Sequence, residues 1–494
     1  MANLNGHEGG NAGYGQGEPK DLGGGGKPPA EGVEGRRQAK GNARPRDTLR
    51  TQSRAGVHQA RERIRQVAEA KKEERFTALL HHVYDIEALR EAYLGLKRDA
   101  AAGIDGETWR SYGEQLEANL ADLSDRLRRG AYRAKPVRRV FIPKADGRQR
   151  PLGVTSLEDK LVQRALTTVL NCIYETDFLG FSYGFRPGRK QHDALDALSV
   201  AIQRKKVNWV LDADIRGYFD SIGHEWLVKF IERRVADRRV VRLIRKWLSA
   251  GVLVDGEWMR SVEGTPQGSG ISPLLANVYL HYVFDLWVHD WRRQAQGDVI
   301  VVRFADDFIV GFQYEQEARR FLVELRERLA AHGLELHPDK TRLIEFGARV
   351  ASDRDRQGRG KPETFDFLGF THVCGKTRQG RFTVLRRTVR KRVRAKLHEV
   401  KAQLRRRLHD PVPEVGRWLG SVVRGHINYY AVPMNFAAVA AFRDRVIWLW
   451  RRALGRRSQK ANVTWPRMQR LVRAWIPRVR IAHPYPSQRL CLRT

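Results

Sequence analysis

The spacing of apolar residues divides the chain into a mixed part and a helical part. Over 76–83 apolar residues recur three or four positions apart, which predicts an amphipathic helix. Short apolar runs at 137–142 and 208–215 predict strands, and 298–312 predicts a strand, a turn and a second strand. Helices that alternate with strands in this way indicate an α+β or α/β domain up to about residue 373.

Helices alone are predicted beyond residue 375, and little regular structure is predicted at the beginning of the chain. Over 436–453 apolar residues, Leu449 and Trp450 among them, share one helix face, which predicts a buried stripe. Residues 1–45 are rich in glycine and poor in apolar residues, so we expect a flexible tail. The basic segment 46–74 could form a helix, but we expect it to bury little.

Composition adds a polyanionic partner to this picture. The 494 residues include 91 Lys and Arg against 56 Asp and Glu, a net charge of +35 at pH 7. Nucleic acid is the usual partner of such a chain, ahead of a membrane surface or an acidic protein. Cys172, Cys374 and Cys491 lie too far apart in sequence for paired zinc ligands or a disulfide framework. No apolar run approaches the roughly 18–20 residues of a membrane-spanning helix.

The positive charge is concentrated in residues 375–494, which hold 30 of the Lys and Arg residues and only four acids. Acids are too few there for ion pairs along the helices to explain the charge. We therefore predict that basic residues outside the buried stripe bind RNA phosphates. They are Arg443, Arg445, Arg451, Arg452, Arg456 and Arg457. Tyr429 and Tyr430 could stack on bases or pack in a core.

Three aspartates stand at the ends of apolar strand segments. Asp306 and Asp307 lie between the two apolar arms of 301–312. On that segment alone an ordinary turn is the more frequent explanation, because Asp favours turns. Its arms are strongly apolar, however, and buried carboxylates are costly unless they bind cations. Together with Asp214, which ends another apolar run, the pair could hold two Mg²⁺ ions for nucleotidyl transfer.

Two loops have the composition of nucleotide-binding segments. Residues 142–153 (IPKADGRQRPLG) place Lys144 and Arg150 around an Asp-Gly turn, which is either a basic surface turn or a clamp for a triphosphate. Residues 264–280 (GTPQGSGISPLLANVYL) form a glycine-rich loop that leads into a helix and offers Gln267 as a polar contact. The loop lacks the Gly-Lys-Ser/Thr ending of a Walker motif.

Seven blocks follow one another in a recognisable order. They are IPKADGRQRPLG, YGFRPGR (183–189), DADIRGYFDSI, GTPQGSGISPLLAN, RFADDF, LHPDKT (336–341) and FDFLGF (365–370). This ordered set resembles the reverse transcriptases encoded by bacterial group II introns, over roughly residues 76–490. Residues 417–436 (RWLGSVVRGHINYYAVPMNF) resemble the maturase domain, or domain X, which also serves as the polymerase thumb.

The resemblance implies an α+β right-hand polymerase, with fingers and a palm that carries an antiparallel catalytic hairpin, followed by an α-helical thumb/maturase domain. The expected boundaries are 1–74 for a flexible, basic, Gly-rich tail, 75–374 for fingers and palm, 375–387 for a connection, and 388–494 for the thumb and domain X. It also implies an RNA-directed DNA polymerase and maturase that binds its group II intron RNA, assists splicing and copies the RNA into DNA during retrohoming.

The implied partners are the intron RNA, a DNA target or primer, and dNTPs, with no membrane among them. The implied location is the bacterial cytoplasm, as a ribonucleoprotein associated with the nucleoid. The oligomeric state stays open. Asp214, Asp306 and Asp307 match the family's catalytic carboxylates, which bind two Mg²⁺ ions. Phe219 matches an aromatic gate, whose ring would clash with a 2′-OH and so favour dNTPs.

The remaining site residues also come from the resemblance. Lys144 and Arg150 match residues that contact the triphosphate, and Gln267 matches a loop residue near the incoming nucleotide. Lys340 corresponds to a proton donor for pyrophosphate or to a template contact. Residues 367–369 resemble the primer grip.

The chain departs from the family pattern at three places. Phe304 stands where the catalytic turn usually begins with Tyr, which removes a hydroxyl and is expected to leave activity intact. His426 stands where domain X often has Trp, so the role of that position is open. The sequence ends at Thr494 with one nearby cysteine, so we expect a form without the HNH endonuclease, which would use an existing 3′ end as primer.

Two alternatives compete with this interpretation. One is a reverse transcriptase of another bacterial system, such as a retron or a CRISPR-associated enzyme, against which the domain X block argues. The other is a splicing-only RNA-binding maturase whose polymerase has decayed, against which the three aspartates with Gln267 and Lys144 argue.

Overall fold

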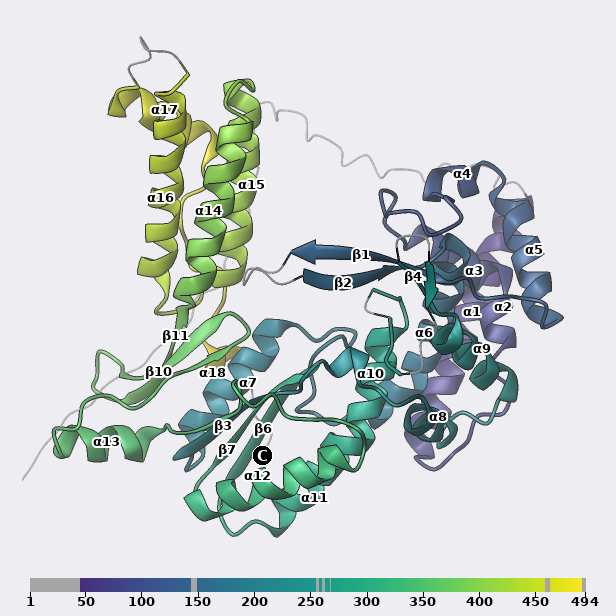
Figure 1. Cartoon of the computed structure of the whole chain (residues 1–494), viewed down its shortest axis with the longest axis horizontal. Helices are drawn as coiled ribbons and strands as arrows, with labels where there is room; N and C mark the ends of the chain where they lie inside the picture. Colours follow the sequence, from purple (N-terminus) through teal and green to yellow (C-terminus); the bar gives the residue numbers. More distant parts are fainter. Residues whose placement is uncertain are drawn as a thin grey trace, which may run out of the picture. The chain divides into compact units, whose positions relative to one another are not determined.

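Figure 1 shows the computed structural model of the chain. It describes residues 45–143, 149–254, 257–259, 263–266, 268–457 and 463–490. Residues 50–494 form one compact unit, and the described residues outside it are those at the start of helix α1. Within the described residues no helix combines the length and the apolar character that crossing a membrane requires.

Helices dominate the chain up to α10 and enclose a large apolar core. Leu89, Leu123 and Leu166 are fully buried in it, and Val278 joins them from α10. The helices are α1 (Pro45–Ala70), α2 (His81–Tyr84), α3 (Ile86–Leu94), α4 (Trp109–Glu114), α5 (Leu116–Arg128), α6 (Leu157–Asp177), α8 (His224–Glu232), α9 (Arg238–Ser249) and α10 (Ser272–Leu280). The core therefore supplies a helical support for the strands described below.

The segment 76–83 is not the helix that its apolar spacing predicts. Helix α2 begins only at His81. The backbone N–H groups of Leu79 and Leu80 donate to Asp237 Oδ2 at 2.8 and 2.9 Å, so a side chain distant in sequence holds this segment outside a helix. The prediction is wrong here because a tertiary contact overrides local periodicity.

Helix α1 buries more than its basic composition suggests. Ile64 and Ala68 pack in the large core. Arg61 is nearly buried and donates to Glu91 Oε2 of α3 at 2.6 Å. The expectation that 46–74 would bury little is therefore wrong, since α1 is part of the helical core.

A four-stranded antiparallel sheet in the order β6-β7-β3-β8 confirms the strands predicted at 208–215 and 298–312. Val210, Ile300 and Ile309 pack on the side of α7, whereas Val301 and Val310 belong to the large core on the side of α11 and α12 (Figure 1). The strands are β3 (Trp209–Asp214), β6 (Val299–Phe304), β7 (Asp307–Phe312) and β8 (Arg342–Glu345). The helices are α7 (Gln191–Arg204), α11 (Leu286–Gln294) and α12 (Glu315–Ala330), and the π-helical turn η2 (His281–Asp285) joins α10 to α11.

A second sheet has the order β2-β1-β4-β5. Strand β1 (Val137–Pro143) pairs antiparallel with β2 (Gln149–Val154) and parallel with β4 (Val252–Val254). Strand β5 (Glu257–Met259) pairs antiparallel with β4. The strand predicted at 137–142 is confirmed.

A third sheet, β11-β10-β9, precedes the C-terminal helices. It consists of β9 (Phe365–Phe367), β10 (Phe370–Lys376) and β11 (Phe382–Thr388), with the short helix α13 (Ala348–Arg356) before it. The prediction of helices alone beyond residue 375 is therefore wrong for β11. Its seven residues form a regular antiparallel pair with β10, from Phe370↔Thr388 to Lys376↔Phe382.

The C-terminal helices have an apolar core of their own. Val439, Phe442, Val446 and Trp450 are buried, which confirms the stripe predicted for 436–453. Helices α14, α15 and α16 run side by side in Figure 1. The helices are α14 (Arg390–Arg406), α15 (Val412–Tyr430), α16 (Phe436–Leu454), α17 (Trp465–Trp475) and α18 (Pro486–Arg489).

Two tyrosines at the end of α15 pack against neighbouring residues instead of pointing into solvent. Tyr429 donates from its hydroxyl to the carbonyl of Leu368 at 2.7 Å. The ring of Tyr430 lies 5.2 Å from that of Phe370 and 4.6 Å from that of His426. Of the two roles left open by the sequence, the structure favours core packing.

Glycines in α15 allow close packing against Trp475 of α17. A Cβ at Gly420 would lie 2.5 Å from the Trp475 carbonyl oxygen, and one at Gly416 would lie 2.6 Å from its ring. At Gly425 of the same helix a Cβ would meet nothing within 4 Å. Crowding at backbone cannot be relieved by a side-chain rotation, so the two positions should respond to alanine in opposite directions.

We predict that Gly420→Ala destabilises the helical part by about 1–3 kcal/mol, the typical cost of overpacking. Gly425→Ala should instead stabilise it by about 0.5–1 kcal/mol, because alanine loses less backbone entropy in a helix. Urea unfolding followed by tryptophan fluorescence measures both. Equal midpoint shifts for the two variants would contradict the packing described.

Candidate active site

Two of the three predicted aspartates face each other across neighbouring strands. Asp214 ends β3 and is the register partner of Asp307, the first residue of β7. Asp306 immediately precedes Asp307 in the tight turn between β6 and β7, and Phe304 and Asp307 are the last paired residues of these two strands. Strand alternation and the antiparallel register thus bring carboxylates almost a hundred positions apart to one end of the sheet.

These carboxylates perturb one another. Burial of the carboxyl group, with Asp306 and Asp214 beside it, raises the pKa of Asp307 to about 7, although this residue keeps solvent access on one side. A hydrogen bond to Asp214 contributes to the same shift. Lys340 Nζ forms an ion pair with Asp214 Oδ2. A cationic group therefore already neutralises one member of the pair, and Lys340 lies beside the aspartates.

The donor chemistry suits a hard divalent cation. Carboxylate oxygens are the ligands Mg²⁺ prefers, and a cation would offset the burial and the repulsion that together raise the pKa of Asp307. Within the described part of the chain, however, no group of three or more His, Cys, Asp or Glu side chains is arranged as a metal site. The facing pair of Asp214 and Asp307 fits a cation, and a three-ligand arrangement is not formed here.

Phe219 lies in the short turn η1 (Tyr218–Asp220) and is buried. Its carbonyl accepts from Thr265 N at 2.7 Å. Gly264 makes this approach possible: its φ is +83° and a Cβ would lie 2.9 Å from the Phe219 carbonyl oxygen. The Phe219 ring stands edge-on to Phe185 at 6.4 Å. The glycine-rich loop therefore fixes the turn that carries the predicted gate.

A cavity of about 300 Å³ lies between the β1–β2 hairpin and this loop. Arg139, Gly153, Asp220 and Thr265 are among its lining residues. Hairpin, gate turn and glycine-rich loop thus converge, as expected for segments that share one ligand. Lys144 and Gln267 lie outside the described residues, and of Arg150 only the backbone, paired with Ile142, is described.

The six predicted RNA-binding arginines divide into two kinds. Three bind backbone carbonyls: Arg443 Nε donates to Pro477, Arg451 Nε to Val463 and Arg457 Nη2 to Asp410, at 3.0, 2.9 and 2.8 Å. The other three, Arg445, Arg452 and Arg456, are exposed. The guanidinium carbons of Arg445 and Arg452 lie 4.2 and 5.3 Å from the centre of the Trp448 ring.

His426 packs inside the helical part. Its ring stacks on Phe442 at 3.7 Å, and burial lowers its pKa to about 4. A neutral, buried ring at this position is a packing residue.

Local sequence patterns did not identify the residues that hold the β6–β7 turn in place. A Cβ at Gly184, in the block YGFRPGR, would lie 2.3 Å from Ala305 N, so that block packs directly on the turn. Arg303, in the apolar run VVRF, is fully buried. A charged residue inside an apolar strand is a signal that could have identified it, since buried charges need partners.

Comparison with known proteins places these features in a family. Residues 142–372 match the model "Reverse transcriptase (RNA-dependent DNA polymerase)". Protein YkfC of Escherichia coli K12 is 33% identical over 328 residues, which cover 58% of this chain and 85% of that protein. Group II intron-encoded protein LtrA of Lactococcus lactis subsp. cremoris is 35% identical over 221 residues, or 44% of this chain and 37% of that protein.

More distant similarity reaches intron maturases. Nuclear intron maturase 3, mitochondrial, of Arabidopsis thaliana is 28% identical over 129 residues, which cover 26% of this chain and 18% of that protein. The matched region thus spans well under half of the intron-encoded protein and of the maturase compared here. On the match to the reverse transcriptase model and the extensive similarity to these relatives, the chain belongs to the reverse transcriptases encoded by group II introns, a family of RNA-dependent DNA polymerases.

Proposed function

We propose that this chain binds a group II intron RNA, assists its splicing and copies it into DNA during retrohoming. The observation that carries the proposal is the facing pair of Asp214 and Asp307 at the end of an antiparallel sheet, inside the matched reverse transcriptase region. A group II intron-encoded protein and an intron maturase are among the relatives, which supports the RNA-binding half of the proposal.

The layout we propose follows the right-hand polymerase plan. The sheet β6-β7-β3-β8 would be the palm, and the β1–β2 hairpin with the helices around it the fingers, within residues 75–374. After a connection at 375–387, the helices α14 to α17 would form the thumb and maturase domain within 388–494. Residues 1–74 would form the basic N-terminal tail.

The reaction we propose is attack of a primer 3′-OH on a dNTP. Asp214, Asp306 and Asp307 would hold two Mg²⁺ ions, whose chemistry when bound is to activate the hydroxyl and to neutralise the leaving pyrophosphate. Reverse transcriptase domains use divalent ions, which agrees with the carboxylate chemistry of the site. Lys340, which forms an ion pair with Asp214, would give a proton to the pyrophosphate as it leaves.

Nucleotide selection would depend on the segments around the cavity. Lys144 and Arg150 would bind the triphosphate, and Gln267 would contact the incoming nucleotide. The ring of Phe219, fixed through the Thr265–Phe219 hydrogen bond, would leave no room for a 2′-OH. A fixed backbone matters here because steric exclusion of one hydroxyl requires a gate that does not move aside.

RNA binding would depend most on the exposed arginines. Arg445, Arg452 and Arg456 have guanidinium groups free of backbone carbonyl contacts among the described interactions, whereas Arg443, Arg451 and Arg457 have structural contacts to satisfy. The intron RNA, a DNA target or primer, and dNTPs are therefore the partners we propose.

The first test concerns the carboxylates. Asp306→Ala with Asp307→Ala should reduce primer extension by roughly 10³-fold or more, because several kcal/mol of charge stabilisation are lost. Affinity for the intron RNA and RNA splicing should be retained. Asp339→Ala, an exposed carboxylate beside Lys340, is the control and should keep activity. Extension by the double variant would refute the assignment, and splicing without extension by the unaltered chain would favour a splicing-only maturase.

The second test uses the raised pKa of Asp307. Below about pH 7 this carboxyl is protonated and must release its proton to bind a cation, so affinity should fall as pH falls. Mn²⁺ affinity, measured by electron paramagnetic resonance, should drop by roughly fivefold between pH 7 and 6, and by roughly tenfold for each further pH unit, if one proton is displaced. Asp307→Asn should bind weakly and without this dependence. A flat profile for the unaltered chain would contradict the coupling.

The third test separates the two kinds of arginine. When Arg445, Arg452 and Arg456 are replaced by Gln, the association constant for RNA should fall less steeply with salt concentration. The magnitude of the slope of log K against log salt should decrease by roughly 0.7–0.9 for each phosphate that is no longer neutralised. The unfolding midpoint should stay unchanged. Arg443→Gln is the control: without its bond to Pro477 the chain should be less stable and keep the same slope. An unaltered slope in the triple variant would exclude these residues from the RNA surface.

A further inference from the structure

A completely buried ion pair lies directly behind the catalytic turn. Arg303 of β6 and Asp285 at the end of η2 both have side chains that are 0% exposed. Arg303 Nε donates to Asp285 Oδ1 at 2.7 Å and Nη2 donates to Oδ2 at 2.5 Å. This two-pronged geometry is the arrangement that compensates a guanidinium for the loss of water.

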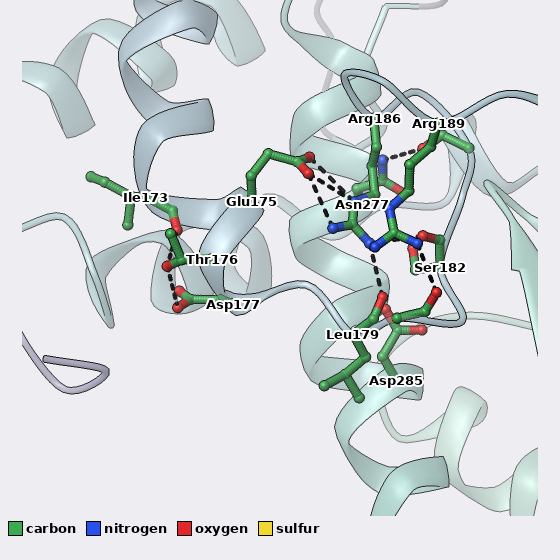
Figure 2. A network of polar contacts seen from close by, with 12 residues as sticks. Ile173, Glu175, Thr176, Asp177, Leu179, Ser182, Arg186, Arg189, Asn277 and Asp285 are labelled. Atoms are coloured by element: carbon green, nitrogen blue, oxygen red, sulfur yellow. Dashed lines mark hydrogen bonds and ion pairs between the residues drawn. The ribbon is translucent and has the colours of Figure 1, made fainter. Parts of the chain in front are cut away.

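The other donors of Arg303 reach three further parts of the chain. Nη1 donates to Asn277 Oδ1 at 3.0 Å and to the carbonyl of Ala305 at 2.9 Å. Nη2 also donates to Ser182 Oγ at 2.7 Å. Figure 2 shows Ser182, Asn277 and Asp285, which come from a loop, from α10 and from η2, gathered in one place. One side chain therefore joins these segments to the turn.

The loop in this network is itself held in place. Arg186 Nη1 donates to the carbonyls of Ser182 and Leu179 at 2.7 and 2.8 Å, and its Nη2 pairs with Glu175 Oε2 at 3.0 Å (Figure 2). Asn277 Nδ2 donates to the carbonyl of Gly184 at 2.7 Å. The loop therefore presents a fixed surface to the turn.

The turn needs such support because its backbone is strained. Ala305 has a φ of +57°, the left-handed region that residues with a Cβ seldom adopt. Its carbonyl is the one that Arg303 Nη1 binds. Tyr183 N donates to the carbonyl of Arg303 and Arg303 N donates to that of Phe181, both at 2.9 Å. Ala305, which immediately precedes Asp306, is therefore held by the Arg303 guanidinium. The backbone of Arg303 is in turn held by Phe181 and Tyr183.

We propose that Arg303 is a positioning residue for the polymerase reaction. Its guanidinium is neutralised by Asp285 and holds the Ala305 carbonyl. This contact fixes the backbone of the turn and thereby orients the carboxylates of Asp306 and Asp307. It touches neither substrate nor cation, so it acts through the carboxylates. The inference rests on the proposed function in one respect, namely that these carboxylates bind the catalytic cations.

Arg303→Lys separates this role from simple neutralisation of Asp285. Lysine keeps a positive charge, but a single ammonium cannot reproduce the fork that reaches Asp285, Asn277, Ser182 and Ala305 together. Its matched control is Arg234→Lys, because the Arg234 side chain is only 3% exposed, pairs with Asp177 at 3.0 Å and binds the carbonyls of Ala68 and Lys71. Arg234 serves helix α1 and makes none of the contacts that hold the turn.

Three quantities are measured on the full chain: the urea unfolding midpoint, kcat and KM for dNTP in primer extension, and the Mn²⁺ affinity of the protein alone by electron paramagnetic resonance. Both variants should lose stability. Arg303→Lys alone should lower kcat by about 10²-fold with KM for dNTP little changed, since small misplacements of reacting groups cost this much. It alone should also weaken Mn²⁺ binding by roughly 10- to 100-fold, as loss of groups that orient ligands does.

The outcomes distinguish this inference from the proposed function. A folded Arg303→Lys variant with unchanged kcat and Mn²⁺ affinity would overturn the positioning role and leave the polymerase assignment intact. An unaltered chain that fails to extend a primer, while its Mn²⁺ affinity still falls in Arg303→Lys, would overturn the polymerase assignment alone. If Arg303→Lys does not fold, Ser182→Ala removes one acceptor and leaves the ion pair: weaker Mn²⁺ binding supports the role, and unchanged binding overturns it.

Discussion

The arrangement of the candidate active site depends on the burial of Arg303 against Asp285. Both side chains are withdrawn from water, so each requires the other, and the remaining guanidinium donors must also find acceptors. Those acceptors lie in the loop before α7, in α10 and in the catalytic turn. The requirement to satisfy one buried cation therefore fixes the relative positions of four segments, and the strained Ala305 can persist because they constrain it together.

The site also shows why a basic chain keeps acids at the end of this sheet. Asp214 and Asp307 face each other, and burial of the Asp307 carboxyl, together with the neighbouring charges of Asp306 and Asp214, raises its pKa to about 7. Lys340 lies against Asp214, where a positive charge lowers the cost of gathering the carboxylates. Carboxylates gathered in this way repel one another, and a divalent cation is one means of compensating that repulsion. Reverse transcriptase domains use divalent ions, so the cluster suits the chemistry of the family.

Local signals in the sequence were sufficient for strands β1, β3, β6 and β7 and for the buried stripe of α16. The near-continuous apolar runs of β6 and β7 are typical of strands buried on both faces, and Asp214 and Asp307 could be identified as strand-end residues because each stands at the end of such a run. The same local logic failed at 76–83, where Asp237 captures two backbone N–H groups and the helix begins later. The spacing of apolar residues gives no information about a hydrogen-bond acceptor that lies far away in the sequence.

The support of the site was beyond sequence reasoning for a related reason. Arg303 and Ser182 are separated by 121 positions, and no spacing rule connects them. Likewise the six arginines of the helical part look alike in sequence, and only the carbonyls of Pro477, Val463 and Asp410 distinguish three of them. Composition could assign a function to the group as a whole, whereas the roles of its members depend on tertiary contacts.

Buried Arg–Asp pairs recur at the junctions of this chain, and its composition explains why. Besides Arg303 with Asp285, Arg386 of β11 donates to Asp196 of α7 at 2.6 Å, and Arg489 of α18 approaches the same carboxylate at 2.6 Å. Arginine is abundant in this chain and acids are fewer. A buried carboxylate that accepts from two or three donors can therefore join several elements at once. At this second site, removal of Asp196 leaves two guanidinium groups without their shared partner, whereas removal of Arg489 leaves Asp196 paired with Arg386. The junction of α7, β11 and α18 should therefore tolerate the loss of Arg489 better than the loss of Asp196.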